Sequence, residues 1–289
     1  MFILKKSQIN YPKLLMELHK PPEKLFCKGV LELFDKPSIA IVGTRRYSDY
    51  GKAATQKIIQ ELSLIDINIV SGLAKGIDTI AHKAALENGL STIAVLGSGL
   101  EQVYPRENRS LAKEIATKGL LISEYPPDSP PEKYHFPQRN RIISGLCLAT
   151  VVIEAPIKSG ALITADFALD QGRDIFVVPG DIDRPNSQGI FNLLQRGVAC
   201  PISSGKELMQ RLNLIPTKSP QNTLTNISDL KIGEKEAIVL AQLSKYRARS
   251  IEDISKKVPL HTSEILGFLS LLEIRELVEN RAGKYLRLI

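Results

Sequence analysis

Short runs of apolar residues that end in glycine-rich turns recur along the chain from Ser38 onward. Between them lie segments such as KAATQKIIQEL (52–62) and TIAHKAALENG (79–89), whose apolar residues recur at the spacing of one helix face. Runs rich in β-branched residues that alternate with amphipathic helices are typical of a parallel sheet covered on both faces. We therefore predict a doubly wound, Rossmann-like α/β domain over residues 38–212, with a mostly parallel sheet of about six or seven strands. The expected strand segments are SIAIVGTR (38–45), INIVSGLAKG (67–76), STIAVLGSG (91–99), LLISEYPP (120–127), ATVVIEAP (149–156) and DIFVVPGD (174–181).

Three further segments flank this domain in the prediction. Residues 1–37 are too short for a domain, and we expect them to pack as a lead-in on the core. Residues 213–231 lack periodicity and are rich in Pro, Ser, Thr and Asn, which is typical of a linker. Residues 232–289 suggest a small winged-helix domain. Its expected parts are helices over 235–245, 250–258 and 261–277, an N-cap at Ser250, and two strands that turn at Ala282-Gly283.

Composition adds a bias toward an anionic partner. The 289 residues carry a net charge of +7 and are 43% apolar, enough for a large core. A mildly basic protein without a polyanionic partner remains an alternative. Cys27, Cys147 and Cys200 are widely spaced in apolar surroundings, which predicts buried thiols in a reducing cytoplasm. No segment resembles a signal peptide or a membrane span, so we expect a cytoplasmic protein without a membrane partner.

Four of the predicted turns are suited to phosphate. In a parallel sheet such turns gather beyond the carboxyl ends of the strands, where ligands bind. Glycine permits close approach, basic residues supply charge, and a helix N-terminus favours an anion. A single turn of this kind is weak evidence, but four in one sheet favour an extended phosphate ligand. The turns are Gly43-Thr44-Arg45-Arg46, Ser71–Gly76, Gly97-Ser98-Gly99, and Lys158-Ser159-Gly160 with Thr164.

The segment KYHFPQRNRIISG (133–145) places an aromatic residue, Phe136, close to Arg139 and Arg141. Guanidinium groups suit phosphate oxygens, and an exposed ring offers a face on which an unpaired base can stack. The alternative is the start of an amphipathic helix with a buried Phe and solvated arginines. The sequence of this segment alone leaves both open.

Enzyme and cofactor motifs are not apparent. The chain has neither GxxxxGK[ST] nor a dinucleotide-binding G-x-G-x-x-G, and no cofactor is expected. Asp78 and His82 lie one helical turn apart and resemble an acid/base pair or half a metal site. With no third ligand in view, we favour a structural hydrogen bond within the helix face and predict no metal site.

Six blocks of the sequence, taken in order over roughly residues 11–212, resemble the DNA-processing protein A family (DprA, also called Smf). HFPQRNRIISG and EAPIKSGALITA are the most specific of these. The full set is GTRRYSDYG (43–51), SGLAKGIDTIAH (71–82), AVLGSGLEQVYPRENRSL (94–111), ISEYPPDSPPEKYHFPQRNRIISGL (122–146), VVIEAPIKSGALITADFAL (151–169) and VVPGDIDRPNSQG (177–189).

The resemblance implies a non-catalytic protein that binds single-stranded DNA, forms a homodimer, and loads the RecA recombinase during natural transformation of competent cells. Asn192 is displaced by one position from the family's pattern and receives no role. The DNA-binding residues implied by the matching positions are Thr44, Arg45, Ser71, Gly72, Lys75, Gly76, Lys133, Phe136, Arg139, Asn140, Arg141, Lys158, Ser159, Gly160 and Thr164.

Several alternatives stay open. The first is an enzyme of related architecture acting on a nucleotide or sugar phosphate. Proteins similar to the cytokinin-activating phosphoribohydrolases share this sheet style and carry PGGxGTxxE at the corresponding turn, whereas this chain has APIKSGALITA without that glutamate. A dimeric scaffold that binds RNA or a regulatory nucleotide is the second. The predicted third helix of the winged helix is acidic, with Glu264, Glu273 and Glu276 against Arg275. We therefore favour protein contact or autoinhibitory docking over duplex DNA for this domain.

Overall fold

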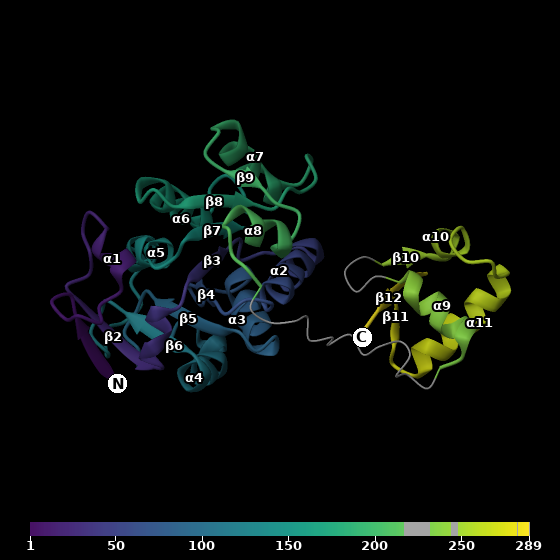
Figure 1. Cartoon of the computed structure of the whole chain (residues 1–289), viewed down its shortest axis with the longest axis horizontal. Coiled ribbons are helices and arrows are strands. Elements are labelled where there is room, and N and C mark those ends of the chain that lie inside the picture. Colours follow the sequence, from purple (N-terminus) through teal and green to yellow (C-terminus); the bar gives the residue numbers. More distant parts are fainter. Residues whose placement is uncertain (217–231, 244–247, 282, 289) are drawn as a thin grey trace. The chain divides into compact units, whose positions relative to one another are not determined.

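A nine-stranded sheet forms the centre of the first of two units, Met1–Ser219, in the computed structural model (Figure 1). The structure describes residues 1–216, 232–243, 248–281 and 283–288. Six strands lie where the sequence predicts them, in mostly parallel arrangement: β3 (Ser38–Val42), β4 (Asn68–Ser71), β5 (Ser91–Leu96), β6 (Leu120–Ser123), β7 (Ala149–Val152) and β8 (Asp174–Val177). The predicted fold class is confirmed.

The sheet is wider than the six or seven strands predicted from the sequence. β1 (Phe2–Lys5) and β2 (Lys24–Gly29) form an antiparallel ribbon, and β2 pairs with β6. Residues 1–37 therefore extend the sheet and do more than pack on it. At the other edge the short strand β9 (Cys200–Pro201) pairs with β8. The strand order is β1-β2-β6-β5-β4-β3-β7-β8-β9.

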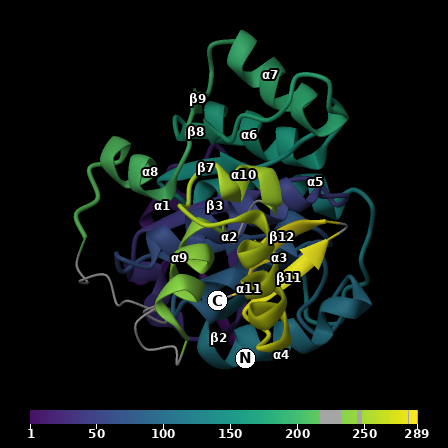
Figure 2. The same ribbon diagram turned by 90° about the vertical axis from the view of Figure 1, so that its right-hand side faces the viewer.

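Alternate residues of the strands pack into different cores, one on each face of the sheet. In β3, Ile39 and Ile41 face one core, whereas Ala40 and Val42 face the other. Both faces are thus covered by helices, which lie on either side of the strands in Figure 1, and Figure 2 views the unit from one of these two helical layers. Residues of α2 (Asp49–Leu62), α3 (Ile77–Glu87), α4 (Arg109–Lys118) and α8 (Gly205–Arg211) pack on the first face. Residues of α1 (Lys13–Met16), α5 (His135–Gly145), α6 (Gly160–Asp170) and α7 (Gln188–Gln195) pack on the second. Short 3₁₀ helices lie at Leu31–Asp35, Arg106–Asn108 and Pro185–Ser187.

Successive strands are added on one side of β3 and then on the other. The connections run from β3 outward through β4, β5 and β6, and then return to place β7 on the other side of β3. Such a switch point leaves a crevice beyond the carboxyl ends of the strands, where ligands bind in open α/β sheets. The loops after β3, β4 and β5 therefore meet at one edge of the sheet.

The second unit, Pro220–Ile289, has the elements of a winged helix. Its helices are α9 (Glu234–Gln242), α10 (Ile251–Ser255) and α11 (Thr262–Ile274). The strands β10 (Arg249–Ser250), β12 (Lys284–Arg287) and β11 (Val278–Arg281) form an antiparallel sheet. Ser250 caps α10 as predicted, since its side chain accepts from the amide of Asp253 at 3.2 Å. Most of the predicted linker, and Ala282 of the predicted turn, lie outside the described residues.

The cysteines differ from the prediction in one case. Cys27 and Cys147 are buried, and burial raises the pKa of both thiols, that of Cys27 to about 12. Cys200 is exposed, because β9 is a two-residue strand at the edge of the sheet. The prediction of a buried thiol at Cys200 is therefore wrong.

Candidate nucleic-acid interface

A small pocket, here called the aromatic pocket, lies where the loops after β3, β4 and β5 meet the N-terminal half of α5. Five of its lining residues were predicted from the sequence, and the structure brings them together. Tyr104, Pro105 and Ala74 complete the wall. The lining residues are Arg45, Gly72, Ala74, Lys75, Tyr104, Pro105, Phe136 and Arg139.

Two rings form one side of the aromatic pocket. The centroids of Tyr104 and Phe136 lie 5.6 Å apart with their planes at 46°. Tyr104 is 45% exposed, and Phe136 is half-buried. Gly97 makes room for the Phe136 ring, because a Cβ at Gly97 would fall 2.8 Å from its Cδ1. The pair thus offers a partly open aromatic surface, on which a base stack contributes about 1–3 kcal/mol.

Two exposed cations border these rings, Arg45 and Lys75. The side chain of Arg45 has no ion pair or hydrogen bond within the described chain. Lys75 pairs with Glu107 at 2.6 Å, which raises the pKa of Lys75 and lowers that of Glu107. Both partners are largely solvent-exposed, so the pair contributes little to stability and leaves Lys75 available to another anion.

The loops that carry these cations touch at Gly76. Gly76 has a φ of +88°, which favours glycine, and a Cβ there would fall 2.3 Å from the carbonyl oxygen of Thr44. The amide of Ile77 donates to the same oxygen at 3.2 Å. Gly76 therefore fixes the spacing between the Arg45 loop and the Lys75 loop.

Arg139 lines the aromatic pocket but is not the free phosphate ligand that the sequence suggested. Only 4% of the residue is exposed. Its Nη1 donates to the carbonyl oxygens of Gly72, at 2.7 Å, and Val95, while Nε donates to Asn140 at 3.1 Å. Burial lowers the pKa of Arg139 to about 10, which still leaves it charged at neutral pH. Arg139 thus supports the loop after β4 and places a positive charge beneath the pocket.

The loop after β4 is held from its other side by Asp78. This buried carboxylate accepts from the amides of Gly72, at 3.1 Å, and Ala74, at 3.4 Å. Burial raises the pKa of Asp78, and the charge of Arg139 opposes that shift. Gly72 is therefore bonded through its carbonyl to a cation and through its amide to an acid.

The predicted hydrogen bond between Asp78 and His82 is wrong, although both residues are buried and structural. Nδ1 of His82 lies 2.7 Å from the hydroxyl of Thr92, whose own proton is donated to Ile69. Nδ1 is therefore the donor. Burial lowers the pKa of His82 to about 3, so the ring is neutral near pH 7. Within the described residues no group of three or more His, Cys, Asp or Glu side chains is arranged to hold a metal ion.

Four further predicted residues are buried and bonded to the chain. The Ser71 hydroxyl donates to Ile41 at 2.7 Å, and the Thr44 hydroxyl accepts from Arg46 at 3.2 Å. Asn140 and Thr164 both donate to the carbonyl oxygen of Gly160, at 3.1 and 3.4 Å. Because their polar atoms already have partners, these residues position loops and join α5 to α6. They are not placed as exposed DNA ligands.

Lys133 and Lys158 are exposed, next to the starts of α5 and α6. Ser159 is the N-cap of α6, accepting from the amide of Ala161 at 3.2 Å, and a Cβ at Gly160 would meet open space. Lys158 with this helix start resembles the anion-binding turn that the sequence predicted. Neither lysine lines the aromatic pocket.

Arg141 lies apart from the aromatic pocket. It is two residues beyond Arg139 on α5, so its side chain leaves the helix on a different face. Its Nη2 donates to both carboxylate oxygens of Glu124 at 2.7 Å. Arg141 therefore does not line the aromatic pocket with Phe136 and Arg139, and its role in DNA binding stays a prediction.

Sequence reasoning missed Tyr104, Pro105 and Glu107 as neighbours of the site. They lie eight or more residues beyond the end of β5, too far for a strand-end argument. The signal was present in the block AVLGSGLEQVYPRENRSL (94–111), which contains a tyrosine outside any predicted helix or strand. Its exposure at 45% is what marks it as a surface aromatic.

A doubly wound sheet with an aromatic and cationic pocket beyond its strand ends defines a Rossmann-like ligand-binding protein. A comparison with known families narrows this class. The family model described as DNA recombination-mediator protein A matches residues 2–213, and the chain belongs to this family.

Relatives are similar over most of the chain. DNA processing protein DprA of Streptococcus pneumoniae is 47% identical over 199 residues, which cover 69% of this chain and 70% of that protein. Protein Smf of Escherichia coli is 36% identical over 284 residues, or 96% of this chain and 75% of that protein.

Two solved structures share the fold. The X-ray structure of DNA processing protein A from Streptococcus pneumoniae has a TM-score of 0.70 at 45% identity, covering 72% of this chain and 73% of that one. DNA processing protein A from Helicobacter pylori has a TM-score of 0.66 at 35% identity, covering 73% of this chain and 95% of that one. The latter structure is described as giving insight into a single-stranded DNA binding mode.

Proposed function

We propose that this chain is a non-catalytic protein that binds single-stranded DNA and acts as a recombination mediator. The observation that carries the proposal is the aromatic pocket, where Tyr104 and Phe136 lie 5.6 Å apart and the exposed cations Arg45 and Lys75 line the same pocket. Rings flanked by cations are what an unpaired strand requires, because bases stack on the rings while phosphates approach the charges. The single-stranded DNA binding described for the Helicobacter pylori relative supports the same ligand.

The pocket favours single strands over duplex DNA, since the bases of a duplex are already stacked and paired. Little preference for base identity is expected, because stacking and backbone contacts are tolerant of sequence. Each phosphate neutralised on a single strand contributes about 0.7 to the slope of log affinity against log salt. Arg45 and Lys75 are proposed as direct ligands, with Lys133 and Lys158 extending the charged surface. Arg139, Asn140, Ser71, Thr44 and Thr164 act by positioning.

The biological part of the proposal follows from the family. The chain would protect incoming single strands, load RecA onto them during natural transformation, and act as a homodimer in the cytoplasm. Across the described residues no helix is long and apolar enough to cross a bilayer. RecA loading is tested by RecA assembly on strands coated with single-strand-binding protein, with and without this chain. Analytical ultracentrifugation tests the homodimer, since the mass in solution should be twice that of one chain.

Two buried carboxylates of the first unit, Glu154 and Asp78, are already hydrogen-bonded within the chain. Glu154 is 5% exposed and accepts from the amide and hydroxyl of Ser48, at 2.9 and 2.5 Å. Asp78 accepts from two backbone amides. Both carboxylates hold loops of the site, which supports a binding protein over a hydrolase.

For the winged helix we propose protein contact. Leu271 and Ile274 of α11 are exposed, the latter by 79%. Arg275 pairs with Glu236 at 3.1 Å, and Lys235 pairs with Glu264 at 3.0 Å. A helix that presents apolar side chains and paired charges suits a protein surface better than a major groove, where free cations are the rule.

The proposal is tested by fluorescence anisotropy with labelled oligo-dT and the corresponding duplex, titrated over salt. The parent is expected to bind the single strand more tightly than the duplex. Phe136→Ala should weaken single-strand binding by about 1–3 kcal/mol, and Phe136→Tyr should retain most of it. Equal affinity for both nucleic acids, with no effect of Phe136→Ala, would reject the pocket as the site.

A further inference from the structure

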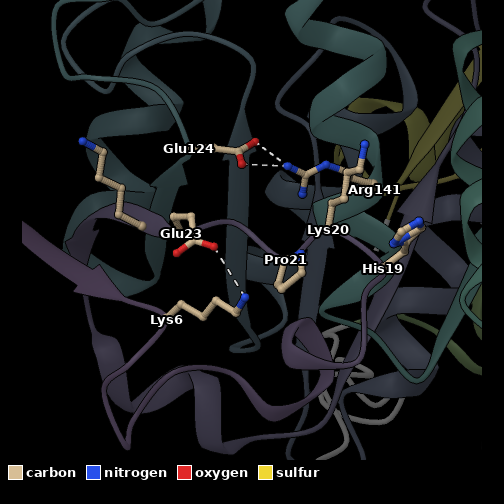
Figure 3. A pocket seen from close by; sticks show the side chains of 8 residues that line it. Lys6, His19, Lys20, Pro21, Glu23, Glu124 and Arg141 are labelled. Carbon is tan, nitrogen blue, oxygen red and sulfur yellow. Dashed lines mark hydrogen bonds and ion pairs between the residues drawn. The ribbon is translucent and has the colours of Figure 1, made fainter.

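A second cavity, of roughly 480 Å³ and here called the ribbon cavity, opens beside the β1–β2 ribbon (Figure 3). Its walls come from the ribbon, from the segment before β2, from the end of β6 and from α5. None of its lining residues belongs to the aromatic pocket. They are Lys6, His19, Lys20, Pro21, Glu23, Lys24, Glu124 and Arg141.

Positive charge dominates the ribbon cavity. Both carboxylates are already paired, Glu23 with Lys6 at 3.4 Å and Glu124 with Arg141 at 2.7 Å, as Figure 3 shows. Lys20 and Lys24 have no carboxylate partner within the described chain. Lys20 and Lys24 therefore line this space without a paired carboxylate.

The ribbon itself brings like charges together at this end. Lys24 is directly opposite Lys5 in the antiparallel register of β1 and β2. Like charges in this relation destabilise a strand pair unless a counter-ion lies near. The Lys24 ammonium also lies 5.5 Å from the centroid of the Phe26 ring, a cation–π contact that retains the full charge. Of this pair, Lys24 lines the ribbon cavity and Lys5 does not, so an anion bound there would offset the charge of Lys24.

The wall of the ribbon cavity is held in place before any ligand arrives. The Tyr11 hydroxyl donates to the carbonyl oxygen of Pro22 at 2.8 Å, and both residues are buried. Pro21 and Pro22 restrict the backbone between Lys20 and Lys24. Glu124 holds Arg141 through two bonds from one nitrogen, and Nη1 of Arg141 has no partner within the described chain.

The ribbon cavity and the aromatic pocket lie at the same end of the sheet, where the parallel strands have their carboxyl ends. Phe26 pairs with Ser123 in antiparallel register, so Lys24 lies beside the carboxyl end of β6. The aromatic pocket lies beyond the carboxyl ends of β3, β4 and β5. From β4 to β2 there are three strand spacings, or about 14 Å. Helix α5 contributes to both, with Phe136 in one and Arg141 in the other.

We infer that the ribbon cavity binds phosphate groups, and that they belong to a single strand continuing from the aromatic pocket past α5. The inference rests on the proposed function for the identity of the strand. The ligand chemistry, a phosphate oxyanion met by Lys20 and Lys24, is independent of it. A strand bound at both places is longer than one bound at the aromatic pocket alone.

The test is a charge-matched comparison in the full chain. Lys20→Gln/Lys24→Gln removes two cations from the ribbon cavity, and Lys83→Gln/Lys113→Gln removes two exposed cations from α3 and α4. Anisotropy is measured with a long oligo-dT and with the shortest oligo-dT that the parent still binds. Inorganic phosphate is titrated in parallel by calorimetry.

The ribbon-cavity variant is expected to bind the long oligo-dT several-fold more weakly than the control variant, with a salt slope smaller by about 1.4 for two phosphates. Its affinity for the short oligo-dT should equal that of the control. Equal behaviour of both variants on the long oligo-dT overturns the inference. If the variant loses only inorganic phosphate binding, the cavity takes a free phosphate and the DNA assignment is overturned. A parent that binds no oligo-dT rejects the proposed function instead, and the phosphate titration then decides the cavity alone.

Discussion

Arg139 donates a hydrogen bond of 2.7 Å to the carbonyl oxygen of Gly72, from below the pocket that both residues line. The amide of the same glycine donates to Asp78 at 3.1 Å. A Cβ at Gly72 would fall 2.6 Å from Nη2 of Arg139, so a larger residue there would displace this buried guanidinium. The loop that presents Lys75 is thus fixed between two buried, oppositely charged side chains.

Replacing Arg139 with alanine should therefore destabilise the fold as well as the site. The change leaves Asp78 buried without a nearby cation and removes the donors to Gly72 and Val95. We expect a loss of about 3 kcal/mol or more in the free energy of unfolding, measured by urea denaturation. Arg45→Ala is the matched control, because Arg45 is exposed, and it should stay within about 0.5 kcal/mol of the parent. An Arg139→Ala variant as stable as the parent would contradict the positioning role.

Gly97 tests the aromatic surface without altering any polar group. Gly97→Ala places a methyl group 2.8 Å from Cδ1 of Phe136, so the ring must move. We expect weaker binding of oligo-dT, with the salt slope unchanged because no charge is lost. Gly267→Ala provides the comparison, since a Cβ at Gly267 meets open space. Unchanged affinity in Gly97→Ala would show that the position of the ring does not matter.

Glu107 competes with DNA for Lys75 in this account. It lies 2.6 Å from the Lys75 ammonium and raises the pKa of that group. Glu107→Gln removes this competitor and should strengthen oligo-dT binding at low salt, an effect that fades as salt screens the charge. Glu114→Gln, which removes the partner of Lys118 on α4, should change affinity less. A weaker complex in Glu107→Gln would mean that the glutamate orders Lys75 for binding.

His82 makes the fold sensitive to acid. Burial lowers its pKa from 6.5 to about 3, so the unfolded chain takes up a proton that the folded chain excludes over that range. The stability from neutral His82 is present above pH 6.5 and is lost as pH falls toward 3. Between pH 6.5 and about pH 5 the loss should reach about 2 kcal/mol in urea titrations. His82→Gln should show a smaller loss over the same interval, and an equal loss would assign the acid sensitivity to other groups.

The six parallel strands could be predicted because each is a continuous apolar run followed by a turn and an amphipathic helix. The ribbon could not, since FILK (2–5) and KLFCKG (24–29) are short and interrupted by lysine, and their pairing is set by contact with β6. β9 contains a proline and has only two residues, which no strand pattern signals. The strands at the two edges of the sheet form through tertiary contacts, which a local sequence pattern does not reveal.

The candidate site could be predicted in its residue types but not in their burial. Arg45 and Arg139 both lie in blocks that resemble one family. Arg45 is exposed, whereas only 4% of Arg139 is exposed. Whether an arginine meets solvent or a backbone carbonyl depends on which loops lie above it. Here the loop after β4 covers Arg139, and that contact joins residues that are 67 apart in the chain.

The central claim is that bases stack on Phe136 and Tyr104. Photo-crosslinking of the full chain to an oligo-dT that carries 5-iododeoxyuridine tests it most directly, because this base reacts with aromatic side chains on which it stacks. After proteolysis, mass spectrometry should find the crosslink on Tyr104 or Phe136, and Phe136→Ala should reduce its yield. Crosslinks confined to residues 232–289, with none in the aromatic pocket, would contradict the account.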